Sequence, residues 1–425
     1  MKKILQFILK TMARLVLAKY QPEVIGISGS VGKTSTKEAV YAVLKDKFNI
    51  RRSLKNYNNE LGVPLTILGV DSPGKSLVGW INLFFYFLKL LVIQDKNYPT
   101  VLILEMGIDR PGDMKYLTSI VFPKIGIITG VGSSHLEFFD KPENIQKEKR
   151  VLVESLDKDS LAILNYDNEL TREMRSSVIC QVLNYGLTEG ADIMAQEINF
   201  NFRSLDNQED LLGVSFKLNY RGAIVPVFLP HVIGYPPIYA ALAASAVALN
   251  YSINLVEIAQ ALSAFRLPPG RLNLISGRKN TKIIDDTYNS SPDSCLAALS
   301  ILSEVKTIRG RKVAVLGDML ELGNSSDSGH REVGRKVAES VDLLVAVGEK
   351  GKIIGEEAKK QGLKDIIYFT DSLKAAEEVL NLVSDGDLIL VKGSQGARME
   401  RVVKVLMSEP EKSLDLLVRQ ERKWQ

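Results

Sequence analysis

The sequence predicts an α/β protein with two main domains, each built on a mostly parallel sheet with helices on both faces. Three observations lead to this fold class. A glycine-rich segment at residues 29–35 follows directly after a short apolar run, similar apolar runs alternate with helical segments along the chain, and a Pro-Pro-Gly break at residues 267–271 divides the alternation in two. We therefore expect a P-loop, doubly wound central domain followed by a Rossmann-like C-terminal α/β domain.

The domain boundaries follow from the same pattern. The 425 residues are too many for one core. We expect a basic amphipathic helix over residues 1–20, a central domain over residues 21–267 and a C-terminal domain over residues 268–425.

The central domain is expected to contain four buried strands, each a short apolar run that ends at polar turn residues. They lie at residues 24–27, 101–104, 125–129 and 161–164. Alternating apolar residues over 192–229 indicate antiparallel strands at the edge of this domain, and the Ala-, Val- and Leu-rich stretch 240–249 indicates a close-packed helix. In the C-terminal domain we expect strands at residues 281–284, 312–316, 343–347, 366–369 and 388–391.

Composition excludes several classes of protein. The net charge of +4 is small for this length and no aromatic-rich basic stretch is present, so we expect no nucleic-acid partner. Cys180 and Cys295 lie far apart in apolar surroundings, which is typical of buried thiols in a reducing, cytoplasmic compartment. No G-x-G-x-x-G pattern follows the first C-terminal strand, so a nicotinamide cofactor is not supported.

The glycine-rich segment predicts a phosphate site. Free backbone N–H groups between a strand and a helix start bind phosphate oxygens. The full phosphate-loop pattern has a glycine where Ile27 stands, so only the shorter G-x-x-G-K-T core is present. A plain glycine turn is the alternative, but it does not account for Lys33 and Thr34 at the helix start. We expect a nucleoside triphosphate on the loop, with Lys33 at its β- and γ-phosphates and the Thr34 hydroxyl on Mg²⁺.

Two more polar residues follow predicted strands. Glu105 ends the run 101–104 and His135 comes shortly after the run 125–129. Ligands of α/β sheets gather at the carboxyl ends of the strands, so we expect Glu105 to hold Mg²⁺ and His135 to contact a metal or phosphate. The alternatives are a solvated carboxylate at a strand end and a structural histidine.

Two segments bear on membranes. Residues 1–20 form a basic amphipathic pattern without a signal-peptide cleavage site, and residues 80–93 are strongly apolar but too short to span a bilayer. We expect the first segment to pack on the central domain as a helix, with a helix on an anionic membrane surface as the alternative. Together the two segments suggest a peripheral membrane contact of a cytoplasmic protein.

Eight short motifs are spread over the chain from about residue 22 to the end. They are GSVGKTS at residues 29–35, NNELGVPLT at 58–66, LEMG at 104–107, SHLE at 134–137 with Lys149 downstream, PGR at 269–271, DDTYNSSP at 285–292, GDMLELG at 317–323 and VKGS at 391–394. Each motif alone is weak, but taken jointly they are specific, and with them the chain resembles the Mur ligase family.

The resemblance implies a ligase that uses ATP and Mg²⁺ to make a peptide bond. A muramoyl-peptide carboxylate would become an acyl phosphate, and an amine such as D-alanyl-D-alanine would attack it. The catalytic residues implied are Lys33, His135 and Lys149, with Thr34, Glu105 and His135 on the metal. Lys149 matches a position that is often carbamylated in the family; on the sequence alone, a solvated helix lysine is an equal alternative.

The resemblance also implies binding residues. Those expected at ATP are Gly29, Ser30, Val31, Gly32, Lys33, Thr34, Ser35, Arg271, Asp286 and Asn289. Turn chemistry is the alternative for Asp285 and Asp286. Those expected at the muramoyl peptide and the incoming amine are Asn59, Glu60, Ser290, Lys392, Ser394 and Arg398.

The sequence departs from the family in two places. Members usually carry a uridine-binding domain ahead of the phosphate loop. In this sequence the first glycine of the phosphate loop is already residue 29. We expect the nucleotide-sugar carrier to be bound by other parts, supplied by a partner or replaced. A Gly-x-His-Asn pattern that helps to hold adenine is also missing at residues 234–239, where Tyr235 or Tyr239 could stack instead.

Two alternative functions remain open from the sequence. One is a related ATP-dependent ligase with another acceptor, of the folylpolyglutamate, cyanophycin or amidating kind. The other is a nucleotide-dependent switch protein, although a switch has no need for Glu105, His135 and Lys149 together.

Overall fold

The structure is a computed structural model that describes residues 2–53, 57–132, 139, 141–205, 208–305, 310–421 and 424. The chain divides into two compact units. The first contains Met1–Ile198, Phe216–Phe228 and Tyr235–Phe265, and the second contains Asn199–Ser215, Leu229–Gly234 and Arg266–Gln425.

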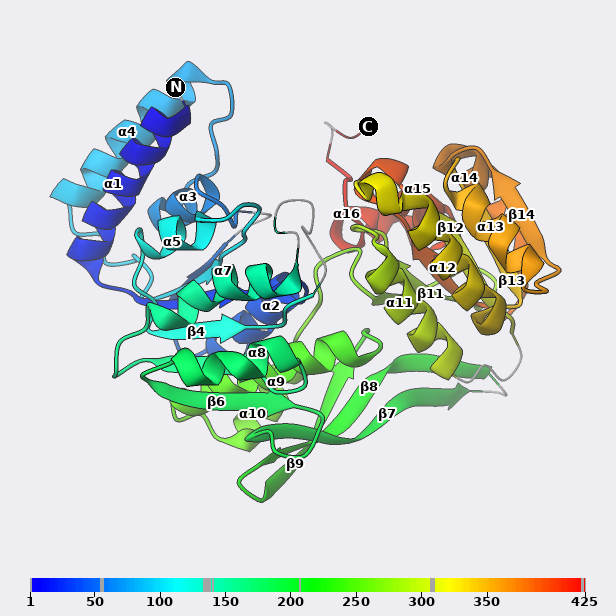
Figure 1. Ribbon diagram of the computed structural model, residues 1–425, viewed down its shortest axis with the longest axis horizontal. Coiled ribbons are helices and arrows are strands. Elements are labelled where there is room, and N and C mark those ends of the chain that lie inside the picture. The colour runs from blue at the N-terminus through cyan, green and yellow to red at the C-terminus, as the bar shows by residue number, and fades with distance from the viewer. Residues whose placement is uncertain are drawn as a thin grey trace. The chain divides into compact units, whose positions relative to one another are not determined.

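The first unit is built on a nine-stranded sheet with the order β2-β3-β1-β4-β5-β6-β7-β8-β9 (Figure 1). Its strands are β1 Glu23–Ser28, β2 Ile50–Arg52, β3 Val101–Glu105, β4 Ile125–Ile128, β5 Leu161–Asn165, β6 Gln181–Gly186, β7 Ile193–Leu205, β8 Gln208–Tyr220 and β9 Ala223–Pro230. Residues 199–205 of β7 and residues 208–215 of β8 are counted with the second unit.

Strand β1 lies between β3 and β4 and is parallel to both. The register pairs Ile27 with Glu105 on one side and Ser28 with Ile128 on the other. The loops that follow these three strands therefore emerge at one edge of the sheet, where doubly wound folds bind their ligands.

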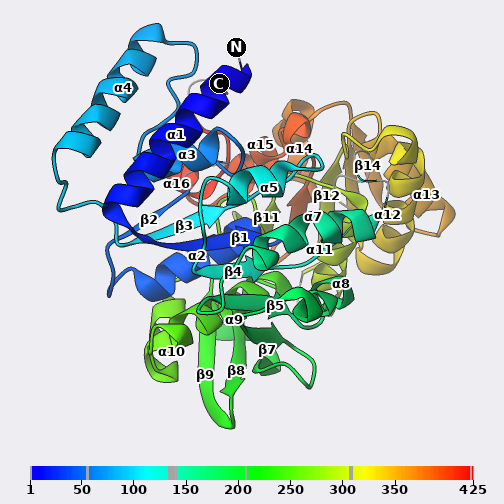
Figure 2. The same ribbon diagram turned by 60° about the vertical axis from the view of Figure 1, so that its left-hand side comes forward.

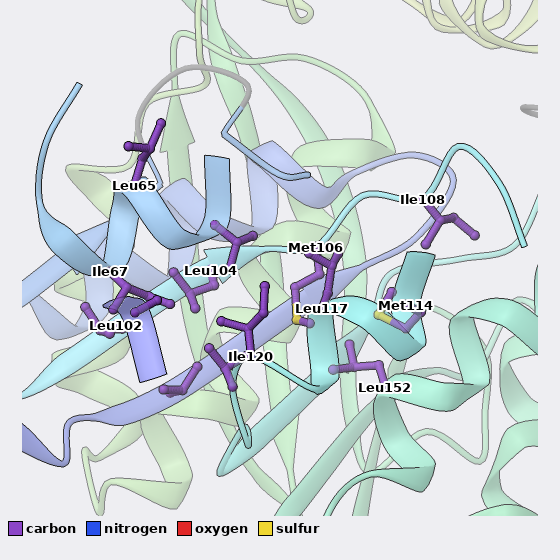
Figure 3. Close-up of a cluster of buried hydrophobic side chains, with 14 of the residues drawn as sticks. Leu65, Ile67, Leu102, Leu104, Met106, Ile108, Met114, Leu117, Ile120 and Leu152 are labelled. Carbon is purple, nitrogen blue, oxygen red and sulfur yellow. The ribbon is translucent and has the colours of Figure 1, made fainter. Parts of the chain in front are cut away.

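Helices cover both faces of this sheet. They are α1 Lys2–Tyr20, α2 Lys33–Leu44, α3 Gly62–Leu68, α4 Leu77–Val92, α5 Asp113–Thr118, α7 Pro142–Glu154, α8 Glu169–Glu173, η1 Met174–Ser177, α9 Tyr235–Asn250 and α10 Leu255–Ser263. Figure 3 shows the core on the face covered by α3, α5 and α7, where Leu102 and Leu104 of β3 meet Leu65 and Ile67 of α3.

Helix α1 packs on the first unit, as predicted. Its residues Leu9, Met12, Ala13 and Val16 are buried in the same core. The apolar segment at residues 80–93 forms most of α4, and α1 and α4 lie side by side (Figures 1 and 2). Within the described residues, no helix has the length and hydropathy needed to cross a bilayer.

The second unit has a six-stranded sheet with the order β10-β11-β15-β12-β13-β14. All its neighbouring strands are parallel except β10 and β11. The strands are β10 Asn273–Ser276, β11 Lys282–Asp286, β12 Lys312–Gly317, β13 Leu343–Val347, β14 Ile366–Phe369 and β15 Leu388–Lys392.

Helices again cover both faces of this second sheet. One core joins α11, α12 and α13 to the sheet, and another joins α14 and α15 to its opposite face. The helices are α11 Pro292–Glu304, η2 Gly323–Ser325, α12 Ser326–Ser340, α13 Gly351–Lys360, α14 Ser372–Leu382, η3 Gln395–Ala397, α15 Glu400–Leu406, η4 Pro410–Lys412 and α16 Ser413–Leu416.

The predicted fold class is confirmed. Every strand expected from an apolar run is present within one or two residues of its predicted bounds, and the residues expected to alternate form β7, β8 and β9 at the sheet edge. Strands β2, β6 and β10 were not predicted, because they are short or carry polar residues.

Candidate active site

The glycine-rich segment lies between β1 and α2, as predicted. Gly32 precedes the helix with a left-handed backbone, φ 83°. Gly29 also has positive φ, and a Cβ there would collide with the Thr129 side chain. The backbone of the loop thus favours glycine at both positions, directly before the N-terminus of α2.

The Lys33 side chain folds back over this loop. Its Nζ donates to the Gly29 carbonyl at 2.6 Å and lies 3.5 Å from the Ser30 carbonyl. The ammonium group is therefore at the glycine loop, where a bound polyphosphate would accept its hydrogen bonds.

Thr34 and Glu105 are in direct contact. The Thr34 Oγ1 lies 3.2 Å and 3.1 Å from the two carboxylate oxygens of Glu105. Both side chains are buried, and Glu105 is only 3 % exposed. A hydroxyl and a carboxylate next to a phosphate loop are the oxygen donors that Mg²⁺ prefers.

The segment after β4 is hydrogen-bonded to the glycine loop. Ser30 N donates to the Gly130 carbonyl at 2.8 Å, and Gly132 N donates to Ser30 Oγ at 3.0 Å. Asn168 fixes the same segment by hydrogen bonds to both the N–H and the carbonyl of Val131, at 3.1 and 3.0 Å. His135 follows three residues after Gly132 but lies outside the described residues.

Lys149 is a buried lysine on α7. It is 1 % exposed, and burial, followed by the nearby positive charge of Lys33, lowers its pKa well below the ordinary 10.5. The sequence alternative, a solvated helix lysine, is therefore wrong. Glu148, the residue before Lys149, accepts hydrogen bonds from Gly112 N and Met114 N at the start of α5.

The segment before α3 places Asn58 beside the Glu105 carboxylate. The sequence had singled out its neighbours Asn59 and Glu60 instead, as contacts of the substrate. Asn58 Nδ2 lies 3.5 Å from Glu105 Oε1, and its carbonyl accepts from Gly107 N at 2.7 Å. Asn59 Oδ1 accepts from Gly62 N at the start of α3, and Glu60 accepts from Gln6 of α1. Asn59 and Glu60 thus have local structural partners.

In the second unit, Asp285 organises the turn that carries Arg271. Its Oδ2 accepts from Gly270 N at 3.0 Å and its Oδ1 from the Thr287 hydroxyl at 2.6 Å. Burial raises the pKa of Asp285 to about 7. The Arg271 guanidinium lies 4.1 Å from the Tyr288 ring centroid, in a cation–π contact.

Asp286, Asn289 and Lys392 come together at the ends of β11 and β15. The buried Lys392 Nζ lies 2.6 Å from Asp286 Oδ2 and donates to the Asn289 carbonyl at 2.9 Å. The register between the strands pairs Asp286 with Lys392 directly. Lys392, which the sequence predicted at a substrate, is therefore paired with the carboxylate of Asp286 in its own chain.

Ser290 and Ser394 also meet, whereas Arg398 faces a different partner. Ser394 Oγ donates to the Ser290 carbonyl at 3.1 Å and accepts from Leu320 N at 2.8 Å. Arg398 pairs with the buried Glu400 at 2.5 Å. Of the six predicted substrate contacts, Ser290, Lys392 and Ser394 thus share one corner of the second unit.

The tyrosines considered for adenine lie at the start of α9. Tyr239 donates its hydroxyl to Asp167 Oδ2 at 2.8 Å, which the sequence did not indicate. No group of three or more His, Cys, Asp or Glu side chains suited to a metal occurs in the described part of the chain. A metal at Thr34 and Glu105 would complete its coordination with phosphate oxygens and water, as Mg²⁺ commonly does.

Comparison with known families supplies the decisive observation. The model of the Mur ligase middle domain matches residues 27–78 and 86–248, and that of the Mur ligase glutamate ligase domain matches residues 270–395. The chain belongs to the Mur ligase family. The matches include the glycine loop, Glu105 and Lys149 in the first domain, and Arg271, Asp286 and Lys392 in the second.

Individual relatives agree with the family. This Mur ligase is 29% identical over 404 residues to UDP-N-acetylmuramoyl-tripeptide--D-alanyl-D-alanine ligase of Bacillus subtilis, covering 95% of this chain and 79% of that one. It is 30% identical to the enzyme of the same name from Buchnera aphidicola subsp. Baizongia pistaciae, over 92% of this chain and 76% of that one.

A solved structure is also similar. The MurF ligase from Thermotoga maritima in complex with ADP superimposes with a TM-score of 0.76 at 26% identity, over 96% of this chain and 84% of that one. The predicted resemblance, the fold class and the enzyme class, an ATP-dependent peptide ligase of peptidoglycan precursor synthesis, are therefore confirmed.

Proposed function

We propose that this Mur ligase joins D-alanyl-D-alanine to the terminal carboxylate of a UDP-N-acetylmuramoyl-tripeptide with the hydrolysis of ATP to ADP and phosphate. The substrates are those named for the relatives from Bacillus subtilis and Buchnera aphidicola. The contact between Thr34 and Glu105 beneath the glycine loop carries the proposal, because it places oxygen donors for a metal beside a cradle for phosphate.

The first step is phosphoryl transfer. The peptide carboxylate attacks the γ-phosphorus of ATP, a carboxyl C–O–P bond forms, and ADP leaves. We assign binding of the triphosphate to Gly29, Ser30, Val31, Gly32, Lys33, Thr34 and Ser35, with the Lys33 ammonium neutralising the charge on the transferred group.

The second step is amide formation. The free amine of D-alanyl-D-alanine attacks the acyl carbon, the C–O bond to phosphate breaks, and the amine loses a proton. The acyl phosphate must be shielded from water during this step, because hydrolysis would waste the ATP. The roles of Arg271, Asp286, Asn289, Ser290, Lys392, Ser394 and Arg398 at nucleotide and substrate, and those of Asn59 and Glu60, stay predictions.

We assign Mg²⁺ to Thr34 and Glu105, with His135 as a further contact. The ion would supply charge neutralisation at the phosphoryl oxygens. The buried donors of the site fit a hard cation with oxygen ligands.

Lys149 is proposed to carry a carbamate. Carbamylation joins the neutral amine to CO₂ and releases a proton, so an amine with a lowered pKa favours it at neutral pH. The resulting anion would remove the repulsion between Lys149 and Lys33. A ¹³C carbamate signal in protein incubated with ¹³C-bicarbonate, absent in Lys149→Arg, is the expected result; no difference between the two proteins would reject the carbamate.

We propose that the enzyme works in the cytoplasm, where ATP is available and Cys180 and Cys295 stay reduced.

One assay tests the function. The full chain is incubated with ATP, Mg²⁺ and UDP-N-acetylmuramoyl-tripeptide, with D-alanyl-D-alanine, single amino acids or ammonia as acceptor, and ADP and ligated product are measured. Product only with D-alanyl-D-alanine supports the proposal. Product with another acceptor alone identifies a related ligase, and ATP hydrolysis that needs no acceptor rejects ligation.

A further inference from the structure

Helix α4 exposes an unusual apolar surface. Its exposed apolar side chains fall on one side when placed at about 100° per residue, within an arc of about 120°. Their exposed fractions range from 37% for Leu88 to 82% for Val92. This α4 stripe consists of Leu77, Val78, Ile81, Phe84, Phe85, Leu88 and Val92.

The opposite side of α4 attaches it to the first unit. Leu83, Phe87 and Leu90 are buried in the core that also contains Leu9 and Val16 of α1. A helix that is apolar on all sides normally lies inside a protein or in a membrane. Here burial is complete on one side only, so the α4 stripe faces outward.

The end of α1 fixes α4 in this orientation. Lys19 Nζ donates to the carbonyls of Leu90, Leu91 and Ile93 at 2.8, 3.0 and 3.0 Å. The Tyr20 hydroxyl lies 3.0 Å from the Leu90 carbonyl and accepts from Asp95 N at 3.0 Å. A cation at the last carbonyls of a helix satisfies them and opposes the negative end of the dipole.

Helix α1 also exposes apolar side chains and adds positive charge. Ile4, Phe7, Ile8 and Leu15 are exposed on it. Lys3 and Arg14 are exposed on the same helix, at the margin of these apolar residues on a helical projection. Figures 1 and 2 both show α1 and α4 side by side.

The charge on the two helices has one sign. The sequences of α1 and α4 contain Lys and Arg but no Asp or Glu. An exposed apolar surface of this extent marks an interaction site. Apolar and aromatic side chains next to basic ones, without acidic residues, complement an anionic lipid surface, where acyl chains and phosphate headgroups lie together.

We propose that α1 and α4 bind the enzyme peripherally to anionic membranes, with the α4 stripe inserted among the acyl chains and Lys3 and Arg14 at the lipid phosphates. The inference goes beyond the ligase activity. Neither helix spans the bilayer in this arrangement; both lie along its surface.

The test is sedimentation of the full chain with lipid vesicles. The protein is expected to sediment with vesicles that contain phosphatidylglycerol, far less with vesicles of phosphatidylcholine alone, and less at high salt. Protein that stays in the supernatant with both vesicle types overturns the proposal. The assay contains no ATP and no peptide, so its result does not depend on the ligase reaction.

Variants locate the contact. The triple variant Phe84→Ser, Phe85→Ser, Leu88→Ser and the double variant Lys3→Glu, Arg14→Glu are each expected to weaken partitioning at least about tenfold. Matched controls are Phe122→Ser with Ile179→Ser, which are exposed apolar residues outside both helices, and Lys359→Glu with Lys364→Glu. Equal losses in variants and controls would contradict the assignment.

Folding and self-association are checked in parallel. Circular dichroism and thermal melting establish that each variant is folded, and light scattering gives its mass. If the unaltered chain is a dimer that the α4 variant converts to a monomer, and neither binds vesicles, a second copy covers the stripe and the membrane proposal is wrong.

Discussion

The Thr34 hydroxyl lies within hydrogen-bonding distance of both carboxylate oxygens of Glu105, at 3.2 and 3.1 Å. The two residues are 71 positions apart in the chain. Parallel pairing of β1 with β3 brings them together, because the register sets Ile27 beside Glu105 and α2 begins a few residues later. The predicted metal ligands thus meet through the topology of the sheet.

Glu105→Gln is expected to raise the Mg²⁺ concentration for half-maximal ligase activity by about tenfold or more, since an amide keeps the shape but loses the negative charge. The measurement is ADP formation against Mg²⁺ concentration. Glu154→Gln, at the last residue of α7, is the control and should leave the curve unchanged. Identical Mg²⁺ curves for Glu105→Gln and the unaltered enzyme would remove Glu105 from the metal site.

Lys33→Ala is expected to lower kcat by about a hundredfold to a thousandfold, because the ammonium group no longer neutralises the transferred phosphoryl group. Steady-state ADP formation at saturating substrates measures this loss. Lys45→Ala, an exposed lysine just after α2, provides the comparison and should be near normal. A kcat within twofold of the unaltered enzyme would contradict the role given to Lys33.

Sequence reasoning located the strands and the glycine loop well, for a physical reason. Buried parallel strands must be continuous apolar runs, and a phosphate loop needs glycines at fixed spacing, so both signals are local. The loop of Gly29, Gly32 and Lys33 between β1 and α2 could therefore be placed from the sequence alone, and its binding of phosphate stays a prediction.

Contacts between distant segments could not be predicted in this way. Asn58 lies beside Glu105 while Asn59 Oδ1 accepts from Leu61 N and Gly62 N before α3, and nothing in the local sequence distinguishes these two asparagines. The ion pair of Lys392 with Asp286 depends on the register between β11 and β15. Likewise, only the packing of α7 shows that Lys149 is buried while Lys147 is exposed.

Lys149→Met is expected to stabilise the fold more at pH 7 than at pH 10. In the folded protein the pKa of Lys149 is lowered well below 10.5. At pH values between this lowered pKa and 10.5, the unfolded chain therefore binds more protons than the folded protein. The free energy of unfolding contributed by this group therefore rises with pH in that window. Methionine removes this dependence while filling similar space.

Urea unfolding at the two pH values, in CO₂-free buffer that prevents carbamate formation, measures the effect of Lys149→Met. Lys147→Met, on the exposed side of the same helix, is the matched control. Equal stabilisation by Lys149→Met at both pH values would show that burial does not disfavour the charged amine.

Asp285→Asn is expected to change how the stability of the second unit depends on pH. Burial raises the pKa of Asp285 from 3.8 to about 7, so between these values the folded protein binds more protons than the unfolded chain. The contribution of Asp285 to the free energy of unfolding is therefore fully present below pH 3.8 and is lost as the pH rises through about 7.

Asparagine has no such titration, but with its oxygen toward Gly270 N its amide nitrogen cannot accept from Thr287 N, which costs about 1–3 kcal/mol. The loss of stability relative to the unaltered chain should thus be larger at pH 5 than at pH 8 in urea titrations. Asp365→Asn, an exposed aspartate in the same unit, should show no such difference, and a pH-independent loss in Asp285→Asn would mean that Asp285 is ionised throughout.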